Sequence, residues 1–195
     1  INQKKITSEA CIHHLYFDER DYEKLGTKIK WNPAIKSEVD KKSILKALLD
    51  DKIDVVATDH APHTIEEKSL DYEDCPSGGP LIQFALPTLI EMHLDKKISL
   101  EKIVEKSSHN PAIIFNIKDR GFIREGYFAD IAIINLNRTW RLRKNDILSK
   151  CKWSPFTNKI FRSKIEHTLV SGHHVFDKGV LHEREKGMRL KFDRV

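Results

Sequence analysis

The sequence contains little cysteine and lacks any long apolar run. Its three cysteines, Cys11, Cys75 and Cys151, are odd in number and far apart. This spacing argues against a disulfide framework and against a Cys-x-x-Cys zinc site. No apolar run approaches the roughly 20 residues that span a bilayer. An initiator methionine is also lacking, so we expect a fragment or a processed chain. These absences predict a cytoplasmic location and no contact with a membrane.

A strong excess of one charge is lacking as well. The chain carries 34 basic and 29 acidic residues, a formal net charge of +5, and the two signs are interspersed. No basic run alternates with aromatic residues, as a single-strand nucleic-acid binder would need, so we expect no nucleic-acid partner. The apolar fraction of 39% and the charged fraction of 32% are typical of a globular protein.

The first 118 residues alternate between strand-like and helix-like patterns. Ser37 is a candidate helix cap, and the β-branched run at 53–58 is typical of a buried parallel strand. In chain order we expect a strand within 6–17, an extended segment at 28–32, a helix at 38–51, a strand at 53–58, a loop at 64–80, helices at 81–94 and 100–107, and a helical turn from Asn110 to near Phe115.

The pattern changes near residue 118, after which glycines separate short alternating runs. We expect a strand at 129–135 and a hairpin in which residues 167–170 and 175–176 flank the Ser171-Gly172 turn. The sequence therefore predicts two parts, an α/β region at 1–118 and a mainly β region at 119–195.

The segment around Asp59 carries the clearest chemical pattern, because the strand at 53–58 runs directly into Asp59-His60-Ala61-Pro62-His63. In a (β/α)₈ barrel the reactive groups follow the C-terminal ends of the strands. A carboxylate there can bind a metal ion and exchange a proton with metal-bound water. The alternative from the local pattern alone is that Asp59 caps a turn and that both histidines lie on a surface loop.

Two pairs of adjacent histidines are weaker candidates for metal binding. The pairs are His13-His14 and His173-His174. Adjacent residues of a strand point to opposite faces, so neither pair is expected to chelate one metal ion. We predict packing and hydrogen bonding for the first pair, and no site at the second.

Several segments, in the expected order, resemble dihydroorotases of the amidohydrolase superfamily. Residues 54–64, Asp-Val-Val-Ala-Thr-Asp-His-Ala-Pro-His-Thr, resemble the last barrel strand of these enzymes. The second histidine of this motif, His63, favours dihydroorotase over hydantoinase or allantoinase. The other similar segments are 12–15, 30–36 with its Asn-Pro loop, 107–112, 121–131, 154–156 and 168–172. The resemblance covers nearly the whole chain.

The resemblance implies reversible interconversion of L-dihydroorotate and N-carbamoyl-L-aspartate, in pyrimidine synthesis, at a zinc centre that is often binuclear. It implies that Asp59 is the metal-linked carboxylate and the general acid/base. It implies that Asn32 and His63 bind the substrate, and that backbone groups near Gly79 bind its ring. The chain departs from the family at this last point, because it reads Gly79-Pro80-Leu81 where the family has Gly-Leu-Glu.

The resemblance also implies the C-terminal part of a metal-dependent (β/α)₈ barrel at 1–118 and part of a small β-sandwich at 119–195. The His-x-His motif and the other metal ligands of the family do not occur in this sequence. A firm catalytic zinc site needs three or more protein ligands. We therefore expect the isolated chain to be inactive and to require the N-terminal remainder of the enzyme. Oligomerisation is common in the family, which makes a homo-oligomer a further expectation.

Two alternatives remain open at this point. One is a related cyclic amidase of the hydantoinase or allantoinase type, which a substrate profile would distinguish. The other is a dihydroorotase-like assembly subunit without catalytic activity, as the missing ligands would suggest. Against the second alternative, Asn32, Asp59 and His63 keep the residue types of an active enzyme.

Overall fold

The computed structural model describes residues 1, 4–184 and 186–193. Its N-terminal part contains a two-stranded parallel sheet of β1 (Glu9–Cys11) and β2 (Val55–Ala57), in which Cys11 lies opposite Ala57. The helices between these strands are α1 (Ile12–Tyr16), a 3₁₀ turn (Glu19–Asp21), α2 (Tyr22–Leu25), a second 3₁₀ turn (Gly26–Ile29) and α3 (Glu38–Leu49). The parallel pairing places the C-terminal ends of both strands at one edge.

Two sequence-based assignments in this part are confirmed only in part. Only three residues of the segment 6–17 form a strand, and His13 and His14 lie on the helical turn α1 that follows. The segment 28–32 begins inside a 3₁₀ turn instead of being extended throughout. Alternating apolar residues over so short a run fit one helical turn as well as a strand, so packing decides between them.

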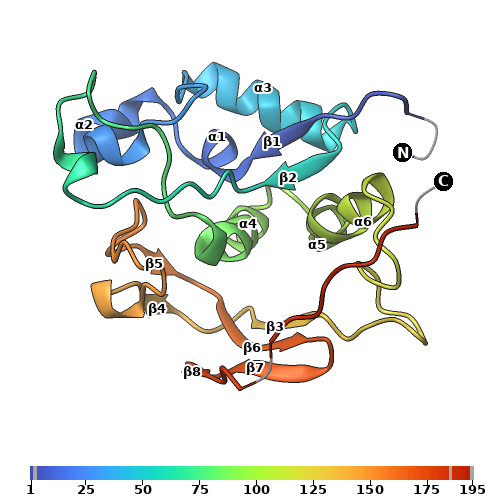
Figure 1. Ribbon diagram of the computed structural model, residues 1–195. Helices are drawn as coiled ribbons and strands as arrows, with labels where there is room; N and C mark the ends of the chain where they lie inside the picture. The colour runs from blue at the N-terminus through green and yellow to red at the C-terminus, as the bar shows by residue number, and fades with distance from the viewer. Residues whose placement is uncertain (2–3, 185, 194–195) are drawn as a thin grey trace.

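The helix α3 follows its prediction closely. The Ser37 hydroxyl accepts a hydrogen bond from the Asp40 backbone N–H, and the Asp40 carboxylate accepts one from the Ser37 backbone N–H, which together form a capping box. The helix buries Leu48, whereas Leu49 on its edge is exposed. The apolar face therefore covers the sheet from one side (Figure 1).

Helices on the other side of the sheet follow a 3₁₀ turn (Glu67–Ser69) in the long loop. A further 3₁₀ turn (Ile82–Phe84) leads into α4 (Ala85–Leu94), where Pro87 occupies the first turn and removes no helical hydrogen bond. Then α5 (Leu100–Val104), a π-helical turn (Glu105–His109) and α6 (Asn110–Ile114) run on as one segment. The Asn110 side-chain amide donates to the Asp54 carbonyl at 2.7 Å, which ties this segment to the start of β2.

The C-terminal part is mainly β, as its pattern predicts. One antiparallel sheet has the order β3-β6-β7-β8, and a small pair joins β4 to β5. The bounds are β3 (Ile131–Asn135), β4 (Trp140–Arg141), a 3₁₀ turn (Lys144–Asp146), β5 (Ile160–Phe161), β6 (Lys164–Val170), β7 (His173–Asp177) and β8 (Val180–Leu181). The expected hairpin is confirmed, since β6 and β7 meet at a turn where Ser171 and Gly172 both have positive φ.

An aromatic cluster joins the two parts of the chain. The Phe156 ring packs on Phe17 and Phe84 from the first part, at centroid distances of 5.2 and 5.8 Å. The buried Glu91 of α4 accepts hydrogen bonds from the Arg162 backbone N–H and guanidinium, just after β5. These contacts hold β4 and β5 against α4.

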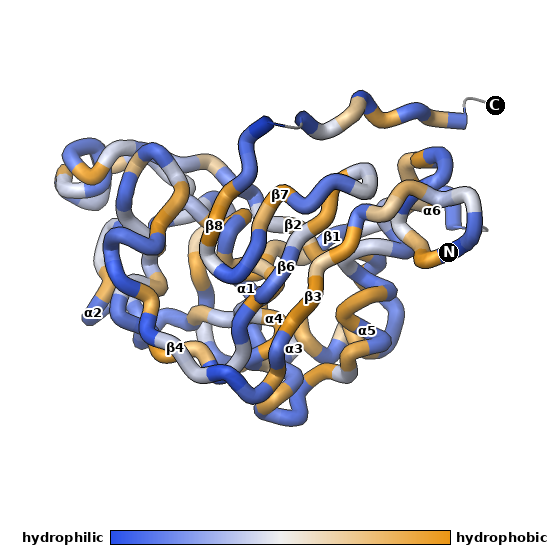
Figure 2. Tube along the Cα trace, turned by 90° about the horizontal axis from the view of Figure 1, so that it is seen from below, coloured by the Kyte–Doolittle hydropathy of each residue, from blue (hydrophilic) through white to orange (hydrophobic). Residues whose placement is uncertain are grey.

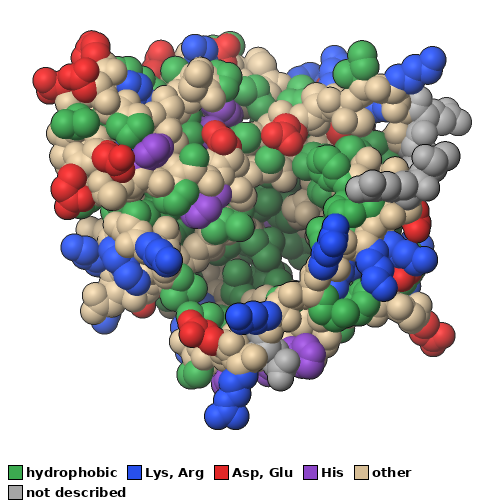
Figure 3. Space-filling view, viewed as in Figure 1, with side chains coloured by type: hydrophobic (Ala, Val, Ile, Leu, Met, Phe, Trp, Pro, Cys, Tyr) green, Lys and Arg blue, Asp and Glu red, His purple; other side chains and the backbone are tan. Residues whose placement is uncertain are grey.

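An open apolar cleft of about 910 Å³ separates α4 and α5 from the larger sheet. Leu86, Leu89 and Ile103 line one wall, and Ile131 and Ile134 of β3 line the other. Figure 3 shows it as a hollow lined by hydrophobic side chains, and Figure 2 shows the apolar colour of β3. Among the described residues, no helix is long and apolar enough to cross a membrane.

Candidate active site

Asp59 lies just beyond the C-terminal end of β2, where the chain bends sharply. Its φ of 47° falls in the left-handed region, which aspartate tolerates better than most residues. The side chain is exposed, and among the described residues it has no hydrogen-bond or salt-bridge partner. A carboxylate held at a strand end without a partner is available to bind a cation or to exchange a proton.

Cys11 ends the neighbouring strand β1, next to Asp59. Burial raises the pKa of the Cys11 thiol to about 11, and the negative charges of Asp59 and Glu9 add to the shift. The thiol is therefore protonated at neutral pH when no metal ion is bound. Of these two groups, Asp59 has the chemistry of a ligand for a hard or borderline divalent ion, so the chain supplies one carboxylate for such an ion at this edge.

Asn32 lies in the loop that follows the second 3₁₀ turn, and its side chain is exposed. The loop is held from several directions. The Lys30 carbonyl accepts a hydrogen bond from Gly78 N–H at 2.9 Å, and the Pro33 carbonyl lies 2.9 Å from His14 Nε2. The buried Lys68 ammonium donates to the Lys30 carbonyl at 3.4 Å. The loop that carries Asn32 thus contacts the glycine-containing segment directly.

His60 serves as a structural acceptor in this part of the fold. Its Nδ1 accepts hydrogen bonds from the backbone N–H groups of Leu81 and Ile82, at 3.0 and 3.2 Å. These donors lie at the start of the 3₁₀ turn that precedes α4, so the imidazole caps that turn. His60 also pairs with Gly79 in an isolated parallel bridge. The motif segment and the segment of Gly79 are therefore side by side.

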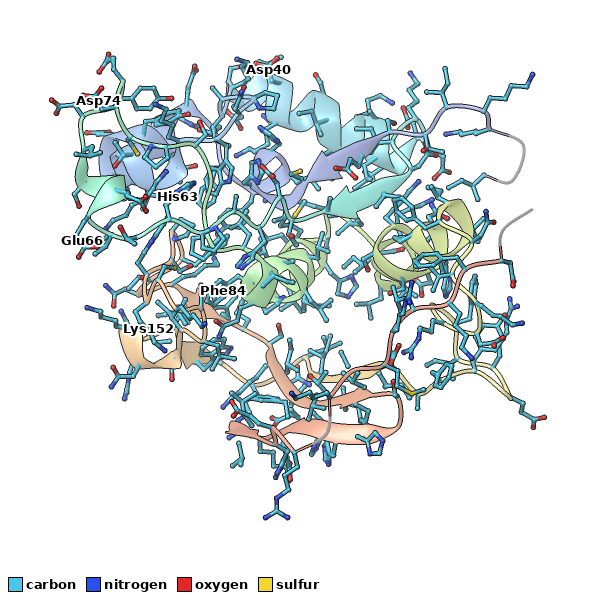
Figure 4. All side chains as sticks on the ribbon, viewed as in Figure 1. Asp40, His63, Glu66, Asp74, Phe84 and Lys152 are labelled. Carbon is cyan, nitrogen blue, oxygen red and sulfur yellow. The ribbon has the colours of Figure 1, made fainter. Side chains whose placement is uncertain are left out.

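His63 is half-buried, and its ring lies between two loops. Its Nε2 lies 3.1 Å from the Ser77 carbonyl, and its Nδ1 lies 3.7 Å from the Glu67 carboxylate. Its backbone carbonyl accepts a hydrogen bond from Trp153 Nε1 at 2.7 Å, which links the motif to the C-terminal part. Figure 4 shows His63 on the segment between β2 and α4. The residue is held in place by its neighbours and is not a free surface histidine.

The two glycines of the long loop allow very close backbone contacts. At Gly78, φ is 123°, and a Cβ would lie 2.5 Å from the Ala61 carbonyl oxygen. At Gly79, a Cβ would lie 2.8 Å from the ring of the buried Trp31. Only residues without a side chain fit both positions. Packing against Trp31 is therefore one reason for a glycine at position 79, besides the substrate contact expected there.

His13 stacks on Trp31 beneath this region, with ring centroids 4.4 Å apart and planes 8° from parallel. The ring is fully buried, and neither nitrogen has a hydrogen-bond partner among the described residues. Burial, with a contribution from neighbouring His14, lowers the pKa of His13 to about 3. His13 is therefore neutral and acts in packing, as expected for this pair, whereas His14 makes the hydrogen bond of the pair.

The segments that carry the four predicted site residues form one contacting group. The loops of Asn32 and Gly79 are joined by the Lys30–Gly78 hydrogen bond, and Gly79 is joined to the Asp59–His63 segment by the bridge to His60. Sequence reasoning missed the supporting residues Trp31, Lys68 and Trp153. Trp31 lies within the matching segment 30–36 and Trp153 directly precedes the segment 154–156, and this adjacency is the one signal that could have indicated them.

Comparison with known proteins agrees with this arrangement. The model of the amidohydrolase family matches residues 5–175. Dihydroorotase from Halobacterium salinarum is 36% identical over 173 residues, which cover 88% of this chain and 40% of that protein. Dihydroorotase from Methanosphaera stadtmanae is 38% identical over 156 residues, covering 79% of this chain and 35% of the relative. The resemblance to dihydroorotases is confirmed, and the chain spans about two fifths of the length of these relatives.

Solved structures show the same fold. L-Hydantoinase (dihydropyrimidinase) from Arthrobacter aurescens superposes with a TM-score of 0.84 at 25% identity, over 90% of this chain and 40% of that one. A D-hydantoinase structure superposes with a TM-score of 0.83 at 22% identity, with the same coverage. The α/β architecture is thus that of these enzymes. The chain belongs to the amidohydrolase family.

Proposed function

We propose that this chain is the C-terminal part of a dihydroorotase, which interconverts L-dihydroorotate and N-carbamoyl-L-aspartate. The observation that supports this most is the exposed, unpartnered carboxylate of Asp59 at the end of a parallel strand. The loops of Asn32 and Gly79 contact its segment. The sequence identity of 36–38% to dihydroorotases favours this substrate over other cyclic amides.

In this proposal Asp59 moves the proton. Its free carboxylate can accept a proton from the attacking water and return it to the ring nitrogen that leaves. A zinc ion, when bound, would lower the pKa of the attacking water. Asn32 has a free side-chain amide that can bind a polar substrate group. His63 would bind the substrate through ring nitrogen Nδ1, because Nε2 lies 3.1 Å from the Ser77 carbonyl, whereas the Glu67 carboxylate is 3.7 Å from Nδ1 and too far for a hydrogen bond.

Asp59 fits a metal ligand, but one carboxylate does not hold a catalytic zinc ion. The proposal therefore includes an N-terminal remainder that supplies the other ligands and a second zinc position. The open cleft of about 910 Å³ supports this, because apolar walls of this extent rarely stay exposed to water. In the same way we propose that β1 and β2 are late strands of a (β/α)₈ barrel, that residues 1–118 belong to it, and that residues 119–195 complete a β-sandwich with further strands.

A hydantoinase-type cyclic amidase is the second candidate. The observation in its favour is the close superposition on L-hydantoinase, at a TM-score of 0.84. Within this chain, His63 is the residue whose substitution distinguishes a dihydroorotase from a hydantoinase-type amidase. If the substrate is dihydroorotate, His63→Ala should raise KM for dihydroorotate. A preference for hydantoin over dihydroorotate in the assembled enzyme would favour the alternative.

The proposal is tested by combining this chain with its N-terminal remainder and measuring ring closure and bound zinc. The assembled enzyme should convert carbamoyl aspartate, and the 195-residue chain alone should not. Asp59→Asn should remove at least about 99% of kcat, while the exposed control Glu125→Gln should keep wild-type activity. Turnover by the isolated chain, or full activity of Asp59→Asn, would contradict the proposal. An assembly that binds zinc but turns over neither substrate would identify a non-catalytic subunit.

A further inference from the structure

A second group of potential metal ligands lies on the larger sheet, on the opposite side of the apolar cleft from β2 (Figure 1). His167 comes from β6, and His174 and Asp177 come from β7. Their ligand atoms all lie within 4.8 Å of one another. His167 Nδ1 is 3.0 Å from His174 Nε2 and 3.1 Å from Asp177 Oδ1. Two imidazoles and one carboxylate are ligands that zinc and similar borderline ions accept.

A β-bulge explains how these three side chains reach one face. His167 is paired with Asp177, so their side chains point the same way. His174 precedes Asp177 by three residues and would point to the opposite face in a regular strand. The register shifts within β7, so that Leu169 pairs with His174 and Val175 is left without a partner. The extra residue turns His174 to the face of Asp177.

This register also explains why the sequence pattern did not predict the group of His167, His174 and Asp177. Reasoning from alternation correctly excludes joint ligation by the adjacent residues His173 and His174. It does not reveal that His174 meets two residues from elsewhere in the hairpin, because a bulge leaves no clear signal in this segment. The prediction for the second histidine pair concerned the two adjacent residues alone, and His173 points to the other face.

Two of the three separations between the ligand atoms are close to those of a metal centre. Ligands about 2.0–2.1 Å from a tetrahedral zinc ion lie about 3.3 Å from one another. The observed separations of 3.0 and 3.1 Å around His167 Nδ1 differ little from this value. His182 follows β8, and its ring centroid is 6.4 Å from that of His174. Its backbone N–H donates to the Val175 carbonyl at 2.9 Å, which holds His182 next to the hairpin that carries the group.

We propose that His167, His174 and Asp177 bind one divalent cation of the zinc class, with His182 or water as the fourth ligand. This site is separate from Asp59 and does not depend on the proposed dihydroorotase activity. The cation would link β6 to β7 and hold the end of β8. The competing interpretation is a surface network in which the His167 ring hydrogen-bonds to its two neighbours without a metal.

The test is a titration of the chelator-stripped 195-residue chain with Co²⁺ and then Zn²⁺, followed by visible absorption and calorimetry. The wild-type chain should bind one equivalent and show the intense visible bands of a four-coordinate cobalt site. His174→Ala should weaken binding at least about tenfold. The matched control His173→Ala removes an exposed histidine from the other face and should bind as wild type.

Asp59→Asn distinguishes this site from the edge of β2, because it should leave the cobalt spectrum unchanged. Circular dichroism of each variant checks that the chain is folded. If the chain alone proves unfolded, the assembly with the N-terminal remainder is used instead, where wild type should hold one more metal ion than His174→Ala. Equal binding by His174→Ala and wild type, or no binding at millimolar metal, would overturn the proposal in favour of the metal-free network.

Discussion

Lowering the pH below about 6.5 should destabilise the fold through one buried imidazole, that of His13. The ring is fully buried against Trp31, and neither nitrogen has a hydrogen-bond partner among the described residues. A proton on this ring would be a buried charge without a counter-ion, which is costly. Burial accordingly lowers the pKa of His13 from 6.5 to about 3.

The sign and the size follow from proton linkage. The unfolded chain takes up the proton near pH 6.5, whereas the folded chain takes it up only near pH 3. The contribution of His13 to stability is therefore fully present above pH 6.5 and is lost as the pH falls towards 3. The loss is about 1.4 kcal/mol per pH unit. Between pH 7 and pH 5 it amounts to about 2 kcal/mol in the free energy of unfolding.

Urea unfolding at pH 7 and pH 5 measures this loss, with His13→Phe as the reference variant. Phenylalanine keeps an aromatic ring against Trp31 and does not titrate, so its free energy of unfolding should fall by about 2 kcal/mol less than that of wild type. The comparison cancels the other acidic groups, which both proteins share. His173→Phe, at an exposed site, should keep the wild-type pH dependence. Equal losses in wild type and His13→Phe would refute the reasoning.

Four further substitutions should lower stability by different amounts. Gly78→Ala should lower the free energy of unfolding by at least about 2 kcal/mol, because φ is 123° and the new Cβ meets a backbone oxygen at 2.5 Å. Gly126→Ala is the control, because its new Cβ would lie in open space, and at a φ of 81° it should cost only about 1 kcal/mol. If urea unfolding gave the same cost for Gly78→Ala and Gly126→Ala, the clash at Gly78 would be contradicted. Ser37→Ala removes the capping box and should cost about 1 kcal/mol, so an unchanged urea midpoint would count against the cap. Glu91→Gln weakens the charged contacts with Arg162 and should lower the free energy of unfolding by about 1.5–3 kcal/mol. Calorimetry measures this as a lower melting temperature, and an unchanged melting temperature would contradict the prediction.

Local chemistry made parts of this fold predictable. Ser37 caps the helix assigned to it, and Ser99 caps α5 in the same way, because a hydroxyl before a helix accepts from the backbone N–H three residues later. The Ser171-Gly172 turn closes the expected hairpin, since both residues tolerate positive φ there. The buried strand before Asp59 was also found, although it is shorter than the β-branched run suggested. Each of these depends on a few neighbouring residues.

Other features depend on contacts that no local pattern contains. Whether His13 lies on a strand or a helical turn is decided by the buried surface that Trp31 offers it. The close approach of Gly79 to Trp31 requires two loops that lie 48 residues apart in the sequence to meet. The grouping of His167 with His174 requires a bulge of one residue. In each case a distant partner or a shift of register decides the outcome.

Asp59 differs from the buried charged residues of this fold in its surroundings. Buried charged groups in this fold have partners: Asp54 accepts from the Lys4 ammonium and the Ser8 backbone N–H, and the buried Lys106 ammonium donates to Asp51. A fold that pairs such groups does so because an unpaired buried charge is costly. Asp59 differs, since it is held at a strand end in a left-handed conformation and makes no contact of this kind among the described residues. Asp59 is exposed and can stay charged without a partner, so its carboxylate is available for the proposed role in binding a metal ion and moving a proton.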